Sequence, residues 1–172
     1  MDKPTPAAQP VTPAQAGAAP LSAQAQPNAG TPSPDAPALH RGDEEPAVTL
    51  DAFLEDQTNA TAVRLEAGED ARALLPHIDR ISLVEVSFPS FRDGRGYSAA
   101  RILREAGYTG ELRAQGDVLV DQVPFMKRCG FDSFAPEAEI DSATLEAALT
   151  RYDHVYQKAA DGQVPVWKLR HG

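Results

Sequence analysis

The stretch ISLVEVSF, residues 81–88, decides the fold of this chain. It is the most apolar strand-like run in the sequence, and its side chains alternate in character. One face carries Val84, Val86 and Phe88, and the other carries Leu83, Glu85 and Ser87. A parallel strand with helices on both faces is apolar along nearly its whole length. The alternation therefore predicts a sheet with one apolar, helix-covered face and one charged face.

The flanking segments repeat this pattern. Residues 63–66 and 111–115 alternate in the same way, and residues 131–134 are a fourth short strand. Helical spacing and end signals predict four helices, at residues 69–78, 99–106, 121–129 and 142–156. Strands that alternate with helices indicate βα units and a parallel sheet. We therefore predict an α/β fold of about four βα units, with helices mainly on one sheet face, in a half-barrel or two-layer arrangement.

Several residues mark where these helices begin and end. Ser98 is the predicted N-cap of the second helix, and Gly107 and Gly130 are predicted left-handed C-caps. Pro76 is expected to kink or shorten the first helix, and Pro124 to place the start of the third helix near Asp121 or to bend it. A last extended segment is predicted at residues 164–169.

The composition divides the chain in two. Residues 1–40 hold nine of the fifteen prolines, three charged residues and no aromatic side chain. Such a segment cannot bury enough apolar surface to offset its ordering entropy. We predict a disordered Ala/Pro-rich tail and linker at residues 1–46 and a single α/β domain at residues 47–172.

Charge and hydropathy exclude several classes of protein. Residues 41–172 carry 15 Lys and Arg against 23 Asp and Glu, and such an acidic domain is not expected to bind nucleic acid. No apolar run approaches the length of a membrane span or a signal peptide, so a cytoplasmic protein without membrane contact is expected. One cysteine, Cys129, and four scattered histidines predict no metal site.

Ligands of parallel α/β folds bind at the carboxyl ends of the strands. The loop after residues 81–88 carries two arginines and two glycines and leads into a predicted helix, and Asp117 follows the next strand. Guanidinium groups and free helix N–H groups favour an anion. This pattern predicts an anion site built from Arg92, Gly94, Arg95, Gly96, Ser98 and Asp117. In the alternative interpretation, the loop is a turn in which the arginines pair with nearby carboxylates and Asp117 caps a helix.

Redox motifs are missing from the sequence. It contains no GxGxxG after a strand, no P-loop and no CxxC pair, so no cofactor is predicted. Cys129 is expected at a helix C-terminus, where the dipole raises the pKa of a thiol, and an inert, buried cysteine is the favoured interpretation.

Three stretches carry a resemblance to a known family. They are FPSFRDGRGYS at 88–98, GYTGELRAQGDV at 107–118, and DQ at 121–122 continuing through MKRCGFD at 126–132. Over roughly residues 60–170 the chain resembles the bacterial domain-of-unknown-function family 934. Members of that family are commonly labelled oxidoreductases of sulfite reduction. The resemblance implies a role in sulfur assimilation without implying a reaction or a catalytic residue, so whether the chain is an enzyme stays open.

Two functions follow from these observations. The first is an accessory protein of assimilatory sulfate and sulfite reduction that binds a small anionic ligand at the predicted anion site. The second is a non-catalytic docking module that binds the assimilatory sulfite reductase, or delivers its cofactor or electrons, with Phe91, Tyr97 and Trp167 as anchors. A homo-oligomer that covers the charged sheet face is a further expected partner.

Overall fold

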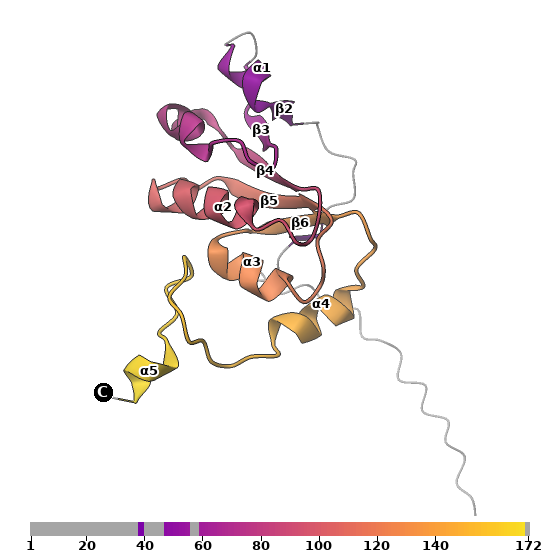
Figure 1. Ribbon diagram of the computed structural model, residues 1–172, viewed down its shortest axis with the longest axis vertical. Helices are drawn as coiled ribbons and strands as arrows, with labels where there is room; N and C mark the ends of the chain where they lie inside the picture. Colours follow the sequence, from indigo (N-terminus) through magenta and orange to yellow (C-terminus); the bar gives the residue numbers. More distant parts are fainter. Residues whose placement is uncertain (1–37, 40–46, 56–58, 171–172) are drawn as a thin grey trace, which may run out of the picture. The chain divides into compact units, whose positions relative to one another are not determined.

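Strand β4 (Leu83–Phe88) is central in a six-stranded sheet, as its apolar character predicts. The computed structural model describes residues 38–39, 47–55 and 59–170 (Figure 1), which belong to one compact unit. Every strand pair in the sheet is parallel. The order across the sheet is β1 (Ala38–Leu39), β6 (Ser133–Pro136), β5 (Glu111–Gly116), β4, β3 (Ala62–Leu65) and β2 (Val48–Thr49).

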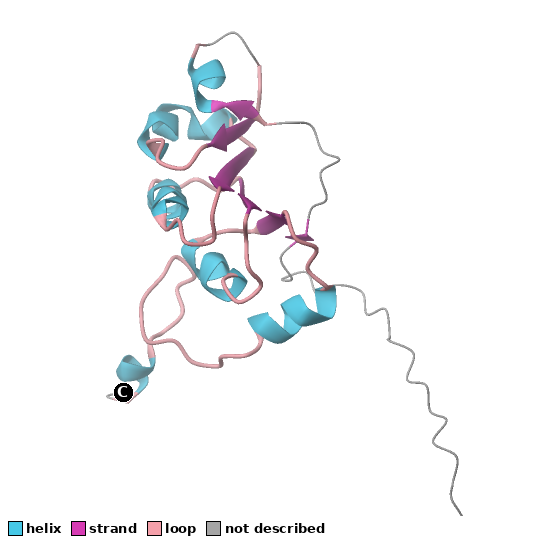
Figure 2. Cartoon of the chain, turned by 45° about the vertical axis from the view of Figure 1, so that its right-hand side comes forward, coloured by secondary structure: helices cyan, strands magenta, loops and turns pink. Residues whose placement is uncertain are grey.

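The connecting helices lie on one side of this sheet (Figure 2), so the predicted α/β fold with one helix-covered face is confirmed. They are η1 (Ala71–Arg80), a 3₁₀ helix, α2 (Arg95–Glu105) and α3 (Val123–Cys129). The remaining helices are α1 (Leu50–Leu54), α4 (Ser142–Leu149) and α5 (Val166–Leu169). Within the described ranges, no helix is long and apolar enough to cross a membrane.

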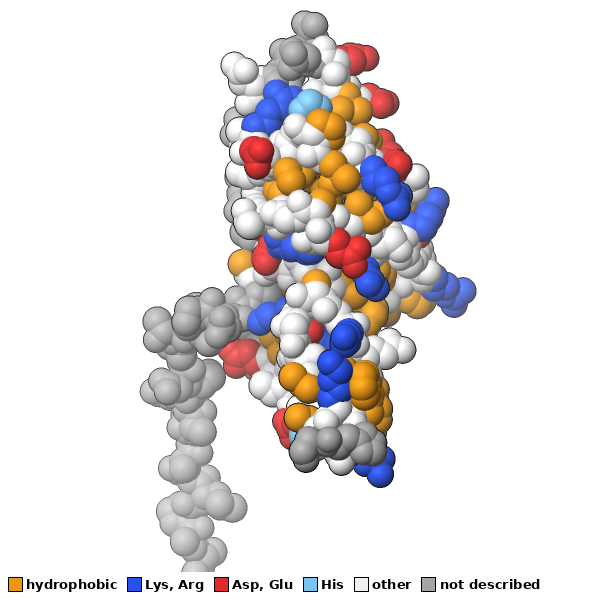
Figure 3. Space-filling view, turned by 90° about the vertical axis from the view of Figure 1, so that its left-hand side faces the viewer, with side chains coloured by type: hydrophobic (Ala, Val, Ile, Leu, Met, Phe, Trp, Pro, Cys, Tyr) orange, Lys and Arg blue, Asp and Glu red, His pale blue; other side chains and the backbone are white. Residues whose placement is uncertain are grey.

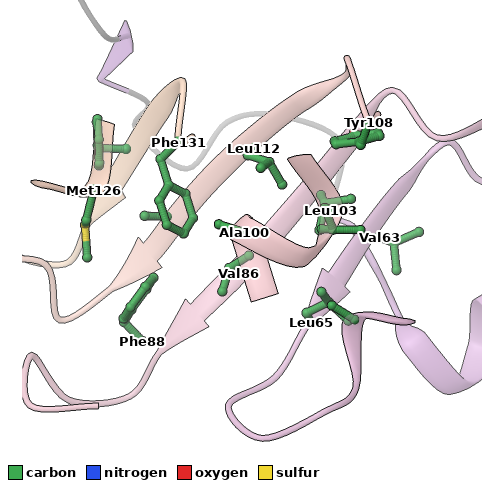
Figure 4. Packing of buried hydrophobic residues seen from close by; sticks show 14 of the residues in the cluster. Val63, Leu65, Val86, Phe88, Ala100, Leu103, Tyr108, Leu112, Met126 and Phe131 are labelled. Carbon is green, nitrogen blue, oxygen red and sulfur yellow. The ribbon is translucent and has the colours of Figure 1, made fainter. Parts of the chain in front are cut away.

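The core fills the space between the sheet and these helices (Figure 4). Val86 and Phe88 of β4 and Leu112 of β5 face Ala100 and Leu103 of α2, and all five are at most 2% exposed. Burial of apolar area contributes roughly 25 cal/mol per Å² to folding. The alternate residues of the central strands thus hold α2 against the sheet.

The opposite face of the sheet carries a row of paired charges. Arg64, Glu85, Arg113 and Ser133 are register partners on four neighbouring strands. Glu85 accepts from Arg64 at 3.0 Å and from Arg113 at 3.4 Å, and Arg113 also pairs with Glu111 at 2.9 Å. Glu85, Arg113 and Ser133 are 7%, 4% and 2% exposed within one chain. A second copy is therefore not needed to bury them, and a homo-oligomer over this face stays a prediction.

One arginine ties together the amino end of the sheet. The Nε and Nη2 atoms of Arg104 donate to the carbonyl oxygen of Gly130 at 3.0 and 2.9 Å. Its Nη1 atom donates to the carbonyl oxygens of Tyr108 and Gly110 at 2.7 and 3.0 Å, and Nη2 also pairs with the Asp132 carboxylate. This side chain therefore joins the turn after α2 to the C-terminus of α3.

The start of α2 differs from its prediction. The helix begins at Arg95 and not at residue 99, so Ser98 lies inside the first turns and is not an N-cap. The reason is Asp93, whose Oδ1 accepts from the Arg95 backbone N–H at 3.0 Å and so organises a helix start four residues earlier. Gly107 and Gly130 have φ of +90° and +110°, as predicted for C-caps.

Three further elements differ from the sequence prediction. Helix α4 ends at Leu149 rather than near Tyr156, whose side chain is 75% exposed and so gains nothing from continuing the helix. Residues 166–169 are a short helix, α5, rather than extended chain. Strand β1 lies in the segment predicted as tail and linker. Apart from β1, the predicted tail at residues 1–46 lies outside the described residues.

Candidate functional site

The loops after β4, β5 and β6 converge at the carboxyl end of the sheet, as the fold predicts. The Asp117 N–H donates to the Phe88 carbonyl oxygen at 2.8 Å, and the Glu137 N–H donates to the Gly116 carbonyl oxygen at 2.9 Å. These bonds fix the loop after β5 between the other two. The candidate site residues of the β4–α2 loop and Asp117 are therefore brought to the same end of the sheet.

Arg95 is committed to a neighbouring carboxylate. Its Nη2 atom lies 2.5 Å from Asp93 Oδ2, and its Nε atom donates to Asp93 Oδ1 at 2.9 Å. The hydrogen bond from the Arg95 side chain lowers the pKa of Asp93 to about 2, and the same contact raises the pKa of Arg95. A Cβ atom on Gly68 would stand 2.7 Å from Arg95 Nη1, so the guanidinium also lies against the turn after β3.

The two glycines of the loop have different surroundings. Gly94 is exposed, and a Cβ atom there would meet no atom within 4 Å. Gly96 is buried, and a Cβ atom would stand 2.5 Å from Phe88 Cζ and 3.0 Å from Val86 Cγ1. Gly96 thus permits close packing of α2 on β4, a role the sequence analysis did not assign to it.

Arg92 and Ser98 are exposed. The Arg92 guanidinium lies 5.3 Å from the ring centroid of Phe91, within the range of a cation–π contact. No ion pair within the described residues involves Arg92. The N-cap residue of α2, Gly94, has no side chain to cap the helix, and the Arg95 N–H is bonded to Asp93 Oδ1 instead. Among the charged residues of the predicted anion site, Arg92 is therefore the one without an ion pair or side-chain hydrogen bond among the described contacts.

Asp117 and Gln122 both hold the backbone of Phe91. The Phe91 N–H donates to Asp117 Oδ2 at 2.9 Å, and the Phe91 carbonyl oxygen accepts from Gln122 Nε2 at 2.7 Å. Gln122 Oε1 in turn accepts from the Leu119 N–H at 3.3 Å. Asp117 is therefore an acceptor for the neighbouring loop rather than a helix cap, and the sequence analysis missed Gln122.

Three apolar side chains surround this clamp and remain partly exposed. Phe91, Leu119 and Phe125 are 38%, 37% and 48% exposed, and we call them the rim surface. Beneath Phe125, the ring of Tyr97 packs 5.4 Å away and also meets Phe88 at 5.5 Å. Burial raises the pKa of Tyr97 to about 12. Tyr97 supports the rim surface, and Phe125, which the sequence analysis missed, takes its place as an exposed ring.

The remaining candidate residues lie elsewhere. Cys129 ends α3 and is half-buried, and burial raises the pKa of its thiol, which agrees with the predicted inert cysteine. Trp167 lies in α5 and is 49% exposed. Among the described residues, no group of three His, Cys, Asp or Glu side chains is placed to hold a metal ion.

These features define a parallel α/β protein with helices on one sheet face and an aromatic rim at the carboxyl end of its strands. The chain belongs to the bacterial protein family of unknown function DUF934, which it matches over residues 62–167, more than half of its length. The matched range begins with β3 and ends in α5, so it includes every residue of the rim surface. The chain matches no curated protein and no solved structure.

Proposed function

We propose that this chain is a non-catalytic docking module that binds a protein partner through the rim surface. The supporting observation is the clamp on Phe91. Both backbone polar groups of this exposed aromatic residue are bonded to side chains of the following loop, Asp117 and Gln122. A ring held in this way loses little conformational entropy when a partner covers it.

The composition of the rim surface suits a protein interface. Aromatic side chains and arginine are enriched among the residues that dominate binding energy, and charged residues are depleted at interface cores. Phe91 and Phe125 supply two rings, and Arg92 lies against the first of them. Leu119 adds a third exposed apolar side chain, and its backbone N–H donates to Gln122 Oε1.

The family resemblance implies the setting of this docking. Because members of the family are labelled with sulfite reduction, the proposed partner is the assimilatory sulfite reductase, and the proposed location is the cytoplasm. In this proposal the chain contributes binding and positioning, while the reductase contributes the redox chemistry.

A second candidate function is the binding of a small anion at the same loops. Arg92 favours it, since its guanidinium is exposed and has no ion-pair partner among the described contacts. Arg95, by contrast, already pairs with Asp93, and Asp117 is bonded to the Phe91 N–H. Two of the six predicted ligands are thus committed to protein groups, and the docking function ranks first.

The docking function is tested by measuring the affinity of the full chain for purified assimilatory sulfite reductase. Phe91→Ser and Phe125→Ser are expected to weaken binding about thirtyfold each, the loss typical of a dominant interface residue. Leu54→Ser is the matched control, because Leu54 is similarly exposed, at 42%, and lies on α1 away from the rim surface. Unchanged affinity for both Phe variants would contradict the docking function.

A thermal-shift titration with sulfate and phosphate separates the two candidates. A bound anion stabilises the folded chain in proportion to RT ln(1 + [L]/Kd), whereas a docking surface does not respond. An anion-dependent rise of the midpoint that disappears in Arg92→Ala would move anion binding to first place.

A further inference from the structure

The segment after α4 exposes an unusual concentration of large apolar side chains. We call residues 150–170 the arm. Five of the nine exposed large hydrophobic residues in the described part of the chain lie there, namely Tyr152, Tyr156, Val164, Trp167 and Leu169. Tyr152 and Tyr156 are 74% and 75% exposed. Contiguous exposed apolar side chains of this kind mark interaction sites.

The arm has a defined conformation. Trp167 Nε1 donates to the Tyr156 carbonyl oxygen at 3.0 Å, and the Val166 N–H donates to the Val155 carbonyl oxygen at 2.8 Å. These two bonds close residues 155–167 into a loop. Its rings are therefore presented on a folded segment, which lowers the entropy lost on binding.

Arg128 of α3 anchors this loop to the sheet domain. Its Nε atom donates to Asp161 Oδ2 at 2.8 Å, and its Nη2 atom donates to the Gln157 carbonyl oxygen at 2.5 Å. The Ala160 N–H donates to the Arg128 carbonyl oxygen at 2.9 Å. The loop is thus fixed at the C-terminal end of α3, whereas the rim surface includes Phe125 in the first turn of that helix.

The arm is basic in an acidic protein. Residues 150–172 carry four Lys and Arg and two Asp, a net charge of +2. Since the whole chain has a net charge of −9, the other residues together carry −11. Asp161 is neutralised by Arg128. No ion pair within the described ranges involves the arm's own cations, which are Arg151, Lys158, Lys168 and Arg170. Figure 3 shows hydrophobic and basic side chains together on the lower part of the molecule, where Figure 1 places the end of the arm.

These charges complement the remainder of the same chain, but the arm does not cover its own domain. The anchoring through Arg128 leaves the Tyr152 and Tyr156 rings exposed within one chain. The residues outside the arm carry a net charge of −11, so a second copy offers the arm a partner of opposite charge. We propose that the arm binds the acidic surface of a second copy of this chain, so that two copies exchange arms.

The available area is sufficient for such a dimer. Three aromatic side chains that bury roughly 130 Å² each give about 400 Å² per arm. Two arms and the surfaces that receive them then amount to about 1,600 Å², the size of a stable protein interface. Exchange of identical arms about a two-fold axis closes the assembly and prevents open-ended growth.

An anionic membrane fits the arm less well than a second copy does. An anionic membrane surface is bound by long amphipathic helices, and α5 has only four residues. The dimer does not depend on the rim surface, which belongs to the opposite end of α3.

The single tryptophan provides a direct readout, because Trp167 lies in the arm and is 49% exposed. The full chain is diluted from high micromolar to nanomolar concentration while its fluorescence and its mass by sedimentation are followed. We expect a doubled mass at high concentration, with a blue-shifted and less quenchable Trp167 emission over the same range. Raising the salt to about 0.5 M should weaken the dimer several-fold, because exposed charges are then screened.

Variants assign the effect to the arm. Tyr152→Ser with Tyr156→Ser should weaken the dimer at least tenfold, and so should Lys168→Glu with Arg170→Glu. Leu54→Ser and Phe91→Ser are matched controls outside the arm and should leave the mass unchanged. A chain that is monomeric at every concentration would overturn the proposal, as would a dimer that the arm variants do not affect. Binding of the monomer to phosphatidylserine vesicles through the arm would assign it to membranes instead.

Discussion

The two ends of the sheet use similar polar side chains for opposite purposes. At the amino end, Arg104 donates to three carbonyl oxygens and to Asp132, and its side chain is only 18% exposed. At the carboxyl end, Asp117 and Gln122 bond to the two backbone groups of Phe91, whose side chain stays 38% exposed. The contacts of Arg104 hold neighbouring elements together, whereas the contacts of Asp117 and Gln122 hold an exposed aromatic residue in place.

The difference indicates where stability and function reside in this fold. Removing Arg104 would leave three carbonyl groups without this donor in a partly buried place, which is costly. Removing Asp117 would release one N–H group near the surface, where water can replace the lost acceptor. Variants at the amino end should therefore affect folding, and variants at the carboxyl end should affect recognition.

The largest expected effect is that of Arg104→Ala. Loss of five hydrogen bonds that join α2, α3 and β5 should lower the free energy of unfolding by roughly 3 kcal/mol or more. For a domain of this size the midpoint of thermal unfolding should fall on the order of 10 °C, measured by circular dichroism. Arg104→Lys should recover only part of this loss, because an ammonium group lacks the planar fork that reaches Gly130 and Tyr108 together.

Arg101→Ala is the matched control on the same helix. Arg101 pairs with Glu105 one turn along α2, and both side chains are well exposed. Exposed pairs of this kind contribute little, so the midpoint should barely change. If the midpoint fell equally in the two variants, the hydrogen bonds of Arg104 would contribute no more to stability than an exposed ion pair does. The proposed contrast between the two ends of the sheet would then be wrong.

A smaller effect is expected at Asp117. Asp117→Ala should lower the free energy of unfolding by about 1 kcal/mol and speed hydrogen exchange of the Phe91 amide, measured by NMR. Asp117→Asn should behave like the wild type, because an amide oxygen also accepts from the Phe91 N–H. A strong loss of function in Asp117→Asn without loss of stability would instead assign Asp117 to ligand binding or proton transfer.

The sheet was predictable because its signal is periodic. The alternation of Val84, Glu85 and Val86 recurs on the neighbouring strands, so the parallel pairing of the four central strands and the charged face follow from the sequence, whereas the short edge strands β1 and β2 do not. The helix end at Gly107 was predictable because glycine readily adopts a positive φ. The start of α3 was predictable because the first turn of a helix tolerates a proline such as Pro124. Each of these rests on a property of single residues or of their spacing.

The site was harder to predict because its contacts join residues that are distant in sequence. Gln122 bonds to Phe91 across 31 positions, and no local pattern signals that pairing. Gly96 looked like a ligand-approach residue but packs against Phe88. The end of α4 was misplaced for a related reason, since Tyr152 and Tyr156 have helical spacing but no core to face. The spacing of apolar residues shows which face of a helix or strand is apolar, but it does not show which other residues pack against that face.

The smallest effect on stability is expected at the Arg95–Asp93 pair, and it decides whether Arg95 is structural. The pKa of Asp93 is lowered to about 2, chiefly by the hydrogen bond from Arg95. A lowered folded-state pKa means that the pair stabilises the fold above about pH 4, and that this contribution is lost as the pH falls toward 2.

In Arg95→Ala the Asp93 pKa, followed by NMR, should return toward its usual value of 3.8. The midpoint at pH 7 should change little, since the Arg95 side chain is 62% exposed and its charge is screened by water. If the Asp93 pKa stays near 2 in this variant, the backbone of the α2 turn holds the carboxylate unaided. Arg95 would then be available as an anion ligand, and the carboxyl end of the sheet would regain a binding role beyond display of Phe91.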